Sequence, residues 1–288
     1  MVKKFAESNQ YHQIKMIVCL VLTCGVYPVL TGCNHNRGYT GDSENSLNKS
    51  IPVIEYTYIK SYPHDTASFT EGLLFRNSKL YESTGATKDL PQTRSLFGIL
   101  NLTTGKIETK AEIDRSKYFG EGIAFLNGKI FQLTYKTKIG FIYDAGTFQK
   151  IGEFIFPGDE GWGMTTDGIN LIMSDGTFEL KFLDPITFNM VKKISVTENG
   201  HAKDNLNELE YINGYIFANI WNTNFIVKIN PKDGKIVGKL NLDPLAYEAN
   251  HIYPGSLEMN GIAYDSINDK IFITGKLWPV IYELQIDK

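Results

Sequence analysis

The chain has 288 residues, enough for one large domain or two small ones, and 42% are hydrophobic, with 16 Tyr and 17 Phe. This composition supports a sizeable core and favours β-strands. The formal net charge is −3 and no basic stripe is present, so nucleic acid is not an expected partner. All three cysteines lie within the first 33 residues, which excludes a thiol nucleophile or a cysteine-ligated metal from the remainder.

Residues 1–32 have the pattern of a signal peptide, in which three lysines precede the apolar run MIVCLVLTCGVYPVL at 16–30. The run ends in Leu30-Thr31-Gly32-Cys33, which resembles the lipobox of bacterial lipoproteins, where the cysteine is lipidated and becomes the new N-terminus. A single-pass anchor is the alternative. Fifteen apolar residues interrupted by Pro28 are, however, short for the roughly 20 that span a bilayer.

Cleavage before Cys33 would remove three lysines and one glutamate, which lowers the net charge from −3 to −5. Residues 33–52 would then comprise the lipidated cysteine and a polar, flexible tether. We therefore expect a protein of the bacterial cell envelope, on its periplasmic or extracellular face, that contacts the membrane only through lipid.

Residues 53–288 show strand patterns almost throughout, with apolar runs of alternating type and no long helical period. Turn pairs of the kind that favours β-hairpins separate these runs. They are Asn-Gly at 127–128 and 213–214, and Asp-Gly at 167–168, 175–176 and 233–234.

An internal repeat is visible when the segments are aligned. FTEGLLFRNSKLYEST (69–84) matches FGEGIAFLNGKIFQLT (119–134), and three later segments, beginning near residues 161, 206 and 258, follow the same plan. The starts are roughly 40–50 residues apart, as in propellers with four-stranded blades. The sequence therefore predicts an all-β, five-bladed β-propeller. A β-sandwich is the alternative, but it does not predict a repeat of this period.

The last repeat has only three strands before Lys288, and the segment IPVIEYTYIKSYP (51–63) is available to supply the fourth. We expect this N-terminal strand to close the last blade, since closure removes an exposed sheet edge.

In a propeller the first strand of each blade lies innermost, so equivalent positions of the repeats converge on the central axis. Here those positions hold acids, an indole and amides, which predicts a site on the axis. They are Glu71, Glu121, Trp162, Asn207 with Glu208, and Asn260. The alternative is that each is a turn residue satisfied locally by backbone groups.

The repeat starts, taken together, resemble the plant-type glutaminyl cyclases, or glutamine cyclotransferases. The motifs that carry the resemblance are FTEGLLF, YFGEGIAF, GWGMTTDG, LNELEYINGYIFANIWNTN and NGIAYD…IFITGKLWP, which extend over about residues 53–286. The resemblance implies a five-bladed propeller that converts N-terminal glutaminyl residues of peptides or proteins to pyroglutamate with release of ammonia.

The resemblance also implies roles for individual residues. The family's catalytic glutamate falls on Glu121. Other catalytic and substrate-binding positions fall on Asn207, Lys276, Phe69, Glu71, Tyr135, Trp162 and Trp221. The chain departs from the family at Glu71, where the plant enzymes have glutamine, and at Tyr135, where they have tryptophan. We expect the first departure to affect the pH optimum or the rate of the chemistry.

These residue types suit the reaction that the resemblance implies. Aromatic walls would desolvate the substrate α-amine and keep it neutral. Asn207, Lys276 or the Trp162 indole would donate hydrogen bonds to the tetrahedral oxyanion. Glu121, with a pKa raised by burial and by Glu71, would carry a proton from the attacking amine to the leaving nitrogen.

No cofactor is expected, because the four histidines after residue 33 show no metal-ligand spacing. A structural cation held on the axis by backbone carbonyls would leave no sequence pattern. Two other functions remain open: a non-catalytic propeller that binds peptide or protein partners, and a lactonase-type hydrolase with Glu71, Glu121 and Glu208 around a divalent ion.

Overall fold

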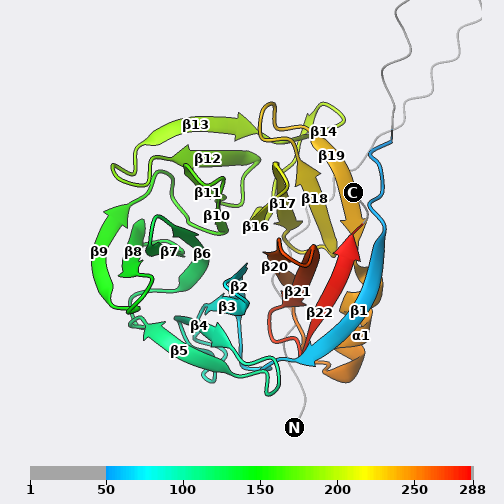
Figure 1. The fold of residues 1–288 in the computed structure, drawn as a ribbon, viewed down its shortest axis with the longest axis horizontal. Coiled ribbons are helices and arrows are strands. Elements are labelled where there is room, and N and C mark those ends of the chain that lie inside the picture. Colours follow the sequence, from blue (N-terminus) through cyan, green and yellow to red (C-terminus); the bar gives the residue numbers. More distant parts are fainter. Residues whose placement is uncertain (1–49, 287–288) are drawn as a thin grey trace, which may run out of the picture. The chain divides into compact units, whose positions relative to one another are not determined.

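A computed structural model of the protein describes residues 50–286. Five four-stranded antiparallel sheets surround a central axis, as Figure 1 shows, and the expected five-bladed β-propeller is confirmed. The predicted signal peptide, Cys33 and nearly all of the tether lie outside the described residues.

In blades 1 to 4 the strands follow one another in chain order from the axis outward, and blade 5 differs only in its outermost strand. The strands of blades 1 and 2 are β2 (Thr70–Arg76), β3 (Lys79–Thr84), β4 (Leu96–Leu100), β5 (Ile107–Glu112), β6 (Gly120–Leu126), β7 (Lys129–Thr134), β8 (Ile139–Asp144) and β9 (Lys150–Ile155). Those of blades 3 and 4 are β10 (Met164–Thr166), β11 (Leu171–Met173), β12 (Glu179–Leu183), β13 (Met190–Ser195), β16 (Leu206–Ile212), β17 (Tyr215–Ile220), β18 (Phe225–Ile229) and β19 (Ile236–Asn241). Blade 5 contains β20 (Met259–Asp265), β21 (Lys270–Gly275), β22 (Val280–Ile286) and β1 (Tyr56–Pro63).

The N-terminal strand closes the ring as predicted. β1 is the outermost strand of blade 5 and pairs antiparallel with β22 along its whole length. Just before it, Val53 forms a bridge with Lys239 of β19, and the Pro52 carbonyl accepts a hydrogen bond from the Lys239 amide. The chain therefore joins blades 4 and 5 before it enters blade 1.

The hydrophobic core lies between the blades. Each of five buried clusters combines side chains of two neighbouring blades. The cluster that joins the last blade to the first packs Leu73 and Leu80 against Phe272 and Ile281. Burial of apolar surface thus holds the ring together at every junction, including the one where the chain ends meet.

Three of the predicted hairpin turns, at 127–128, 167–168 and 213–214, connect the first and second strands of their blades. Asn127 and Gly128 have φ values of 52° and 73°, and Asn213 and Gly214 have 49° and 85°. Two successive residues with positive φ are the requirement of a type I′ turn, which matches the twist of the flanking strands.

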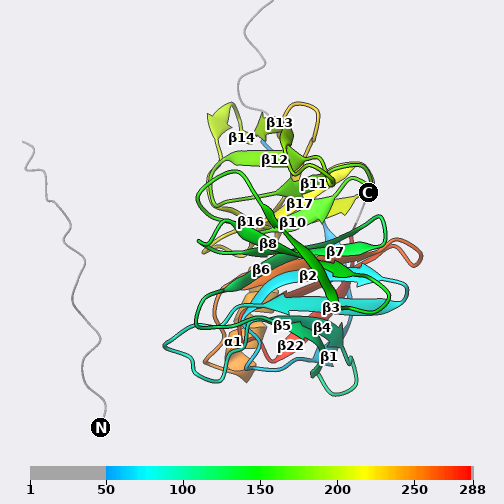
Figure 2. The same cartoon turned by 90° about the vertical axis from the view of Figure 1, so that its left-hand side faces the viewer.

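In the part of the chain that the structure describes, one helix and one short hairpin lie outside the blades, and neither was predicted. The helix, α1 (Asp243–Ile252), connects β19 to β20, so it lies at the face where the inner strands begin; Figure 2 shows it towards one side of the ring. Only Leu245 and Ala249 are buried, and a single apolar pair at i and i+4 gives too short a period to recognise. The hairpin joins β14 (Thr197–Glu198) to β15 (His201–Ala202). Within residues 50–286, no helix has the length and apolar character that a membrane span needs.

Candidate active site

A cavity of about 740 Å³ lies near the starts of the inner strands β2, β6, β10 and β16, and residues that follow the second strands of the blades also line it. Such a volume suits a small ligand or a few residues of a peptide. All eight residues to which the family resemblance assigns a role lie in its lining, with Ala86, Thr87, Lys88 and Phe119 as further lining residues.

Close approach of the inner strands depends on glycine. A Cβ atom on Gly163 would lie 2.2 Å from the Asn207 carbonyl oxygen, and one on Gly122 would lie 2.4 Å from the Met164 nitrogen. Each glycine directly follows a lining residue, Trp162 or Glu121. The repeated glycine therefore lets the preceding side chains meet around one small space.

Glu71 and Lys276 form a buried ion pair at the cavity wall. The Lys276 Nζ lies 2.8 Å from Glu71 Oε1, and the Asn260 amide nitrogen donates to Glu71 Oε2 at 3.0 Å. Burial raises the pKa of Glu71 to about 7, although the charge of Lys276 opposes this rise. For Lys276, burial favours the neutral amine, but the charges of Glu71 and Glu121 outweigh it and raise the lysine pKa. The ammonium also lies 4.6 Å from the centre of the Phe69 ring.

Glu121 is buried in the same wall, with 5% of its surface exposed. Burial, and next the charge of Glu71, raise its pKa well above the usual 4.5, and Lys276 opposes them. Its carboxyl group makes no hydrogen bond or ion pair with any residue in the described range. Glu121 is therefore a carboxyl group that faces the cavity and holds its proton to higher pH than an exposed glutamate does.

Trp162 and Trp221 form one aromatic side of the cavity. Their rings meet edge to face with centroids 5.7 Å apart, and Trp221 is 38% exposed at the mouth. The Trp162 ring packs over Gly176, where φ is +77° and a Cβ would lie 2.7 Å from the ring. The Asp-Gly pair at 175–176 lies in the predicted hairpin turn, between the antiparallel strands β11 and β12, and its glycine also leaves room for the indole.

A second aromatic side runs through Phe69, Phe119 and Tyr135. Phe119 lies 5.8 Å from Phe69 and 6.0 Å from Tyr135, between ring centroids. The Lys136 ammonium lies 4.6 Å from the Tyr135 ring centre and pairs with Glu160 at 3.1 Å. Tyr135 therefore supplies an aromatic wall, as expected.

The three groups expected to stabilise an oxyanion differ in their availability. The Trp162 indole N–H donates to Glu160 Oε2 at 2.9 Å, so it is occupied and is not a free donor. Lys276 lines the cavity with its pair Glu71. Asn207 is buried, and its side-chain oxygen has no hydrogen-bond partner within residues 50–286. A buried amide oxygen without a hydrogen-bond partner is the kind of acceptor to which a bound ligand can donate a hydrogen bond.

Two residues expected in the cavity do not line it. The oxygens of Glu208 accept hydrogen bonds from the amides of Leu73 at 3.1 Å and Ile262 at 2.8 Å. This carboxyl group therefore links blade 4 to blades 1 and 5. Asn260 acts from behind Glu71, where its amide nitrogen also donates to the Thr70 carbonyl at 3.0 Å.

A carboxylate cage for a cation does not form from these residues. Glu71 is occupied by Lys276 and Asn260, and Glu208 by two backbone amides. Within the described part of the chain, no group of three or more His, Cys, Asp or Glu side chains is placed to hold a metal ion.

Sequence reasoning missed Phe119 and the loop residues Ala86, Thr87 and Lys88. A signal for Phe119 was present, since it precedes Glu121 by two residues as Phe69 precedes Glu71. The loop residues follow the second strand of blade 1, where the repeats differ in length and give no common register.

Comparisons with known proteins agree with the fold and identify the family. A family model described as glutamine cyclotransferase matches residues 31–286. The glutaminyl-peptide cyclotransferase of Arabidopsis thaliana is 39% identical over 248 residues, which cover 85% of this chain and 75% of that protein.

A solved structure gives the same result. The crystal structure of Myxococcus xanthus glutaminyl cyclase matches with a TM-score of 0.73 and 31% identity, and the match covers 83% of this chain and 99% of that one. The resemblance found in the repeat starts is confirmed, and the chain belongs to the glutamine cyclotransferase family.

Proposed function

We infer that this protein is a glutaminyl-peptide cyclotransferase, which converts an N-terminal glutaminyl residue to pyroglutamate and releases ammonia. Family membership supports the reaction, and one observation supports the site: Glu121, a buried carboxyl group without a partner in the described residues, faces an aromatic cavity. A nearby lysine already neutralises the second acid, Glu71.

The substrate carries both reacting groups, because its α-amine attacks its own side-chain amide. Much of the proximity effect therefore comes from the substrate. The amine has a reference pKa of about 8 and must be neutral to attack. The aromatic walls around Trp162 and Phe119 desolvate the ammonium form and favour the amine.

Attack on the amide carbon produces a tetrahedral intermediate with a negative oxygen. We propose that Lys276 and Asn207 stabilise this oxygen, Lys276 by its charge and Asn207 by its amide N–H. Asn207 Oδ1 would accept a hydrogen bond from the substrate, which supplies the partner that this buried oxygen lacks.

Ionised Glu121 takes one proton from the attacking nitrogen as the N–C bond forms. It then gives this proton to the amide nitrogen as the C–NH₂ bond breaks, so that ammonia leaves and Glu121 is ionised again. One proton moves, and no oxidant or second substrate is needed. Because burial raises the pKa of Glu121 above its usual value, the carboxylate is a stronger base for the first transfer.

Replacement of Glu71 by Gln is expected to move the acid limb of the kcat–pH profile to lower pH. The charge of Glu71 raises the pKa of Glu121, and Lys276 lowers it. The variant removes the first effect and frees Lys276 to strengthen the second, so Glu121 ionises at lower pH. Initial rates from about pH 5 to 9 test this. An unchanged acid limb would mean that Glu71 does not act on the titrating group.

The reaction itself is tested with the full-length chain and three peptides that differ only at the N-terminus: Gln, Nα-acetyl-Gln and Asn. Mass spectrometry should detect loss of ammonia from the first peptide alone, at equal rates with and without a chelator. Binding of the Gln peptide without turnover would instead favour a peptide-binding propeller. Turnover lost with the chelator would favour metal-assisted hydrolysis.

We also propose that the chain is a bacterial lipoprotein, with a signal peptide at 1–32, lipid on Cys33 and a tether that ends at residue 52. The sequence pattern at Leu30–Cys33 supports this proposal. The location follows: the cell envelope, with contact to the membrane through lipid only.

Replacement of Cys33 by Ser is expected to abolish lipid attachment in a bacterial host. Labelling with a radioactive fatty acid and partition into detergent measure this, and both signals should be lost while ammonia release per molecule persists. Equal labelling of the variant and the wild type would contradict the proposal.

A further inference from the structure

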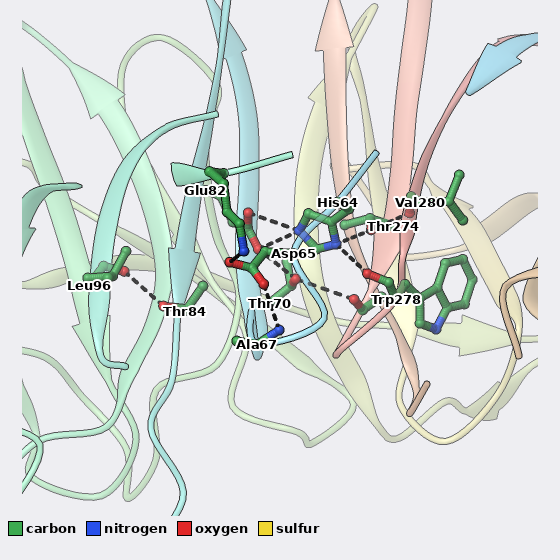
Figure 3. Close-up of polar contacts among 12 residues, drawn as sticks. His64, Asp65, Ala67, Thr70, Glu82, Thr84, Leu96, Thr274, Trp278 and Val280 are labelled. Carbon is green, nitrogen blue, oxygen red and sulfur yellow. Dashed lines mark hydrogen bonds and ion pairs between the residues drawn. The ribbon is translucent and has the colours of Figure 1, made fainter. Parts of the chain in front are cut away.

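A second buried charge pair lies behind the cavity, at the junction of blades 5 and 1. His64 Nε2 lies 3.1 Å from both oxygens of Glu82, and neither side chain is exposed to solvent. His64 Nδ1 lies 2.8 Å from the Trp278 carbonyl oxygen. Figure 3 shows the imidazole between Glu82 on one side and Thr274 and Trp278 on the other.

The contacts define how many protons the pair holds. A carbonyl oxygen only accepts hydrogen bonds, so the His64 Nδ1 that faces Trp278 carries a proton. Nε2 faces a carboxyl group, so one further proton lies between His64 and Glu82. The pair is neutral as a unit, and removal of one partner would leave an unpaired charge or an unpaired polar group in the interior.

The blade fold does not require this pair. Glu82 lies opposite Leu73 in the pairing of the first two strands of blade 1. The equivalent positions of the other four blades hold residues that do not ionise, namely Gln132, Met173, Ala218 and Ile273. The charged pair is therefore a special feature of blade 1, the blade that carries Glu71.

Glu82 is connected to Glu71 through Thr70. The Thr70 hydroxyl donates to Glu82 Oε1 at 2.7 Å, and the Thr70 carbonyl accepts from Asn260. The same Asn260 nitrogen donates to Glu71 Oε2. Glu82 thus fixes the residue directly before Glu71, and Asn260 holds both of these residues from blade 5.

His64 is connected to Lys276 through the turn that follows β21. Lys276 is followed by Leu277, which has a positive φ of 58°, and by Trp278, whose carbonyl accepts from His64. The Leu277 amide donates to the Ser68 carbonyl at 2.8 Å, and the His64 amide donates to the Pro279 carbonyl at 2.9 Å. A non-glycine residue in this conformation needs the support of its surroundings.

We propose that the His64–Glu82 pair is a positioning device for the active site, which holds the backbone on both sides of the ring junction so that Glu71 and Lys276 pair at the cavity wall. His64 and Glu82 do not line the cavity. They act through Thr70 and through the 276–278 turn. The effect on turnover rests on the proposed cyclotransferase function, whereas the effect on the Glu71–Lys276 pair does not.

The test uses the Glu82→Gln variant of the full-length chain, which keeps the shape of the side chain and removes its charge. The expected result is a fall in kcat of about tenfold or more with a smaller change in KM, because small displacements of catalytic groups are costly. A double variant, His64→Gln with Glu82→Gln, restores a neutral pair and should recover part of kcat.

The control is Tyr62→Phe. Tyr62 lies on the closing strand β1, two residues before His64, and donates to Glu283 of β22; neither residue lines the cavity. This variant should lower Tm but leave kcat unchanged at a temperature well below Tm. A kcat of Glu82→Gln that falls only in proportion to the folded fraction would overturn the proposal, because it would show a structural role alone.

A second readout does not need turnover. Carboxyl ¹³C NMR titration, with the Glu71 signal assigned from its absence in Glu71→Gln, reports the pairing with Lys276. In Glu82→Gln the pKa of Glu71 should rise above its wild-type value of about 7, since Lys276 lowers it in the wild type. An unchanged titration of Glu71 would overturn the proposal whether or not the protein is an active cyclotransferase.

Discussion

Glu121→Gln is expected to lower kcat for a Gln-initiated peptide by about 10³-fold or more, with KM changed far less. The substitution keeps the size of the side chain but removes the group that transfers the proton, and general acid–base catalysis typically contributes 10² to 10⁴-fold. Steady-state rates of ammonia release measure the effect. A variant within tenfold of the wild type would mean that another group moves the proton.

The fold should survive this substitution. Burial raises the pKa of Glu121 in the folded protein above its usual 4.5, so the folded state binds more protons than the unfolded chain between these values. Stability contributed by the protonated form is therefore lost as the pH rises from about 4.5 through the folded pKa. Thermal unfolding at several pH values should show a smaller loss of Tm with rising pH in Glu121→Gln than in the wild type.

Lys276→Met is expected to lower kcat by about 10² to 10³-fold, the usual cost of losing one group that stabilises an oxyanion. It should also destabilise the fold increasingly as the pH rises above 7, by up to about 3 kcal/mol, because ionised Glu71 would remain buried without its partner. Below pH 7 the loss of stability should be smaller, since Glu71 would then take up a proton. Turnover assays and denaturant unfolding at pH 6 and 8 measure the two effects.

The matched control is the double variant Lys276→Met with Glu71→Gln. Removal of both charges should restore most of the stability, because no unpaired charge remains. Turnover should stay low, because the cation is still absent. Recovery of kcat together with stability would contradict the proposed role of Lys276 in the chemistry.

Much of the site follows from the repeat. The position before the repeated glycine marks the start of each inner strand, so Glu71, Glu121 and Trp162 were expected to meet at the axis. The structure brings all three to one cavity, because glycine allows the inner strands to approach closely. Equivalent positions of the repeat lie at the same distance from the propeller axis and at the same height along it. The sequence alone therefore allowed us to predict that these three side chains converge.

Contacts across the axis and across blade junctions were not predictable in this way. Glu208 takes a position equivalent to glycine in the other blades, and its length lets it reach two further blades instead of the cavity. His64 lies between Glu82 of blade 1 and the Trp278 carbonyl of blade 5, at the junction where the two ends of the chain pair. The helix α1 was missed for a local reason, its short apolar period.

The most direct test of the central claim is the rate of ammonia release from a Gln-initiated peptide by the wild type and by Glu121→Gln, side by side and with a chelator present. The account predicts sustained release with the wild type and almost none with the variant. Equal rates for the two proteins, or no release by the folded wild type, would contradict it.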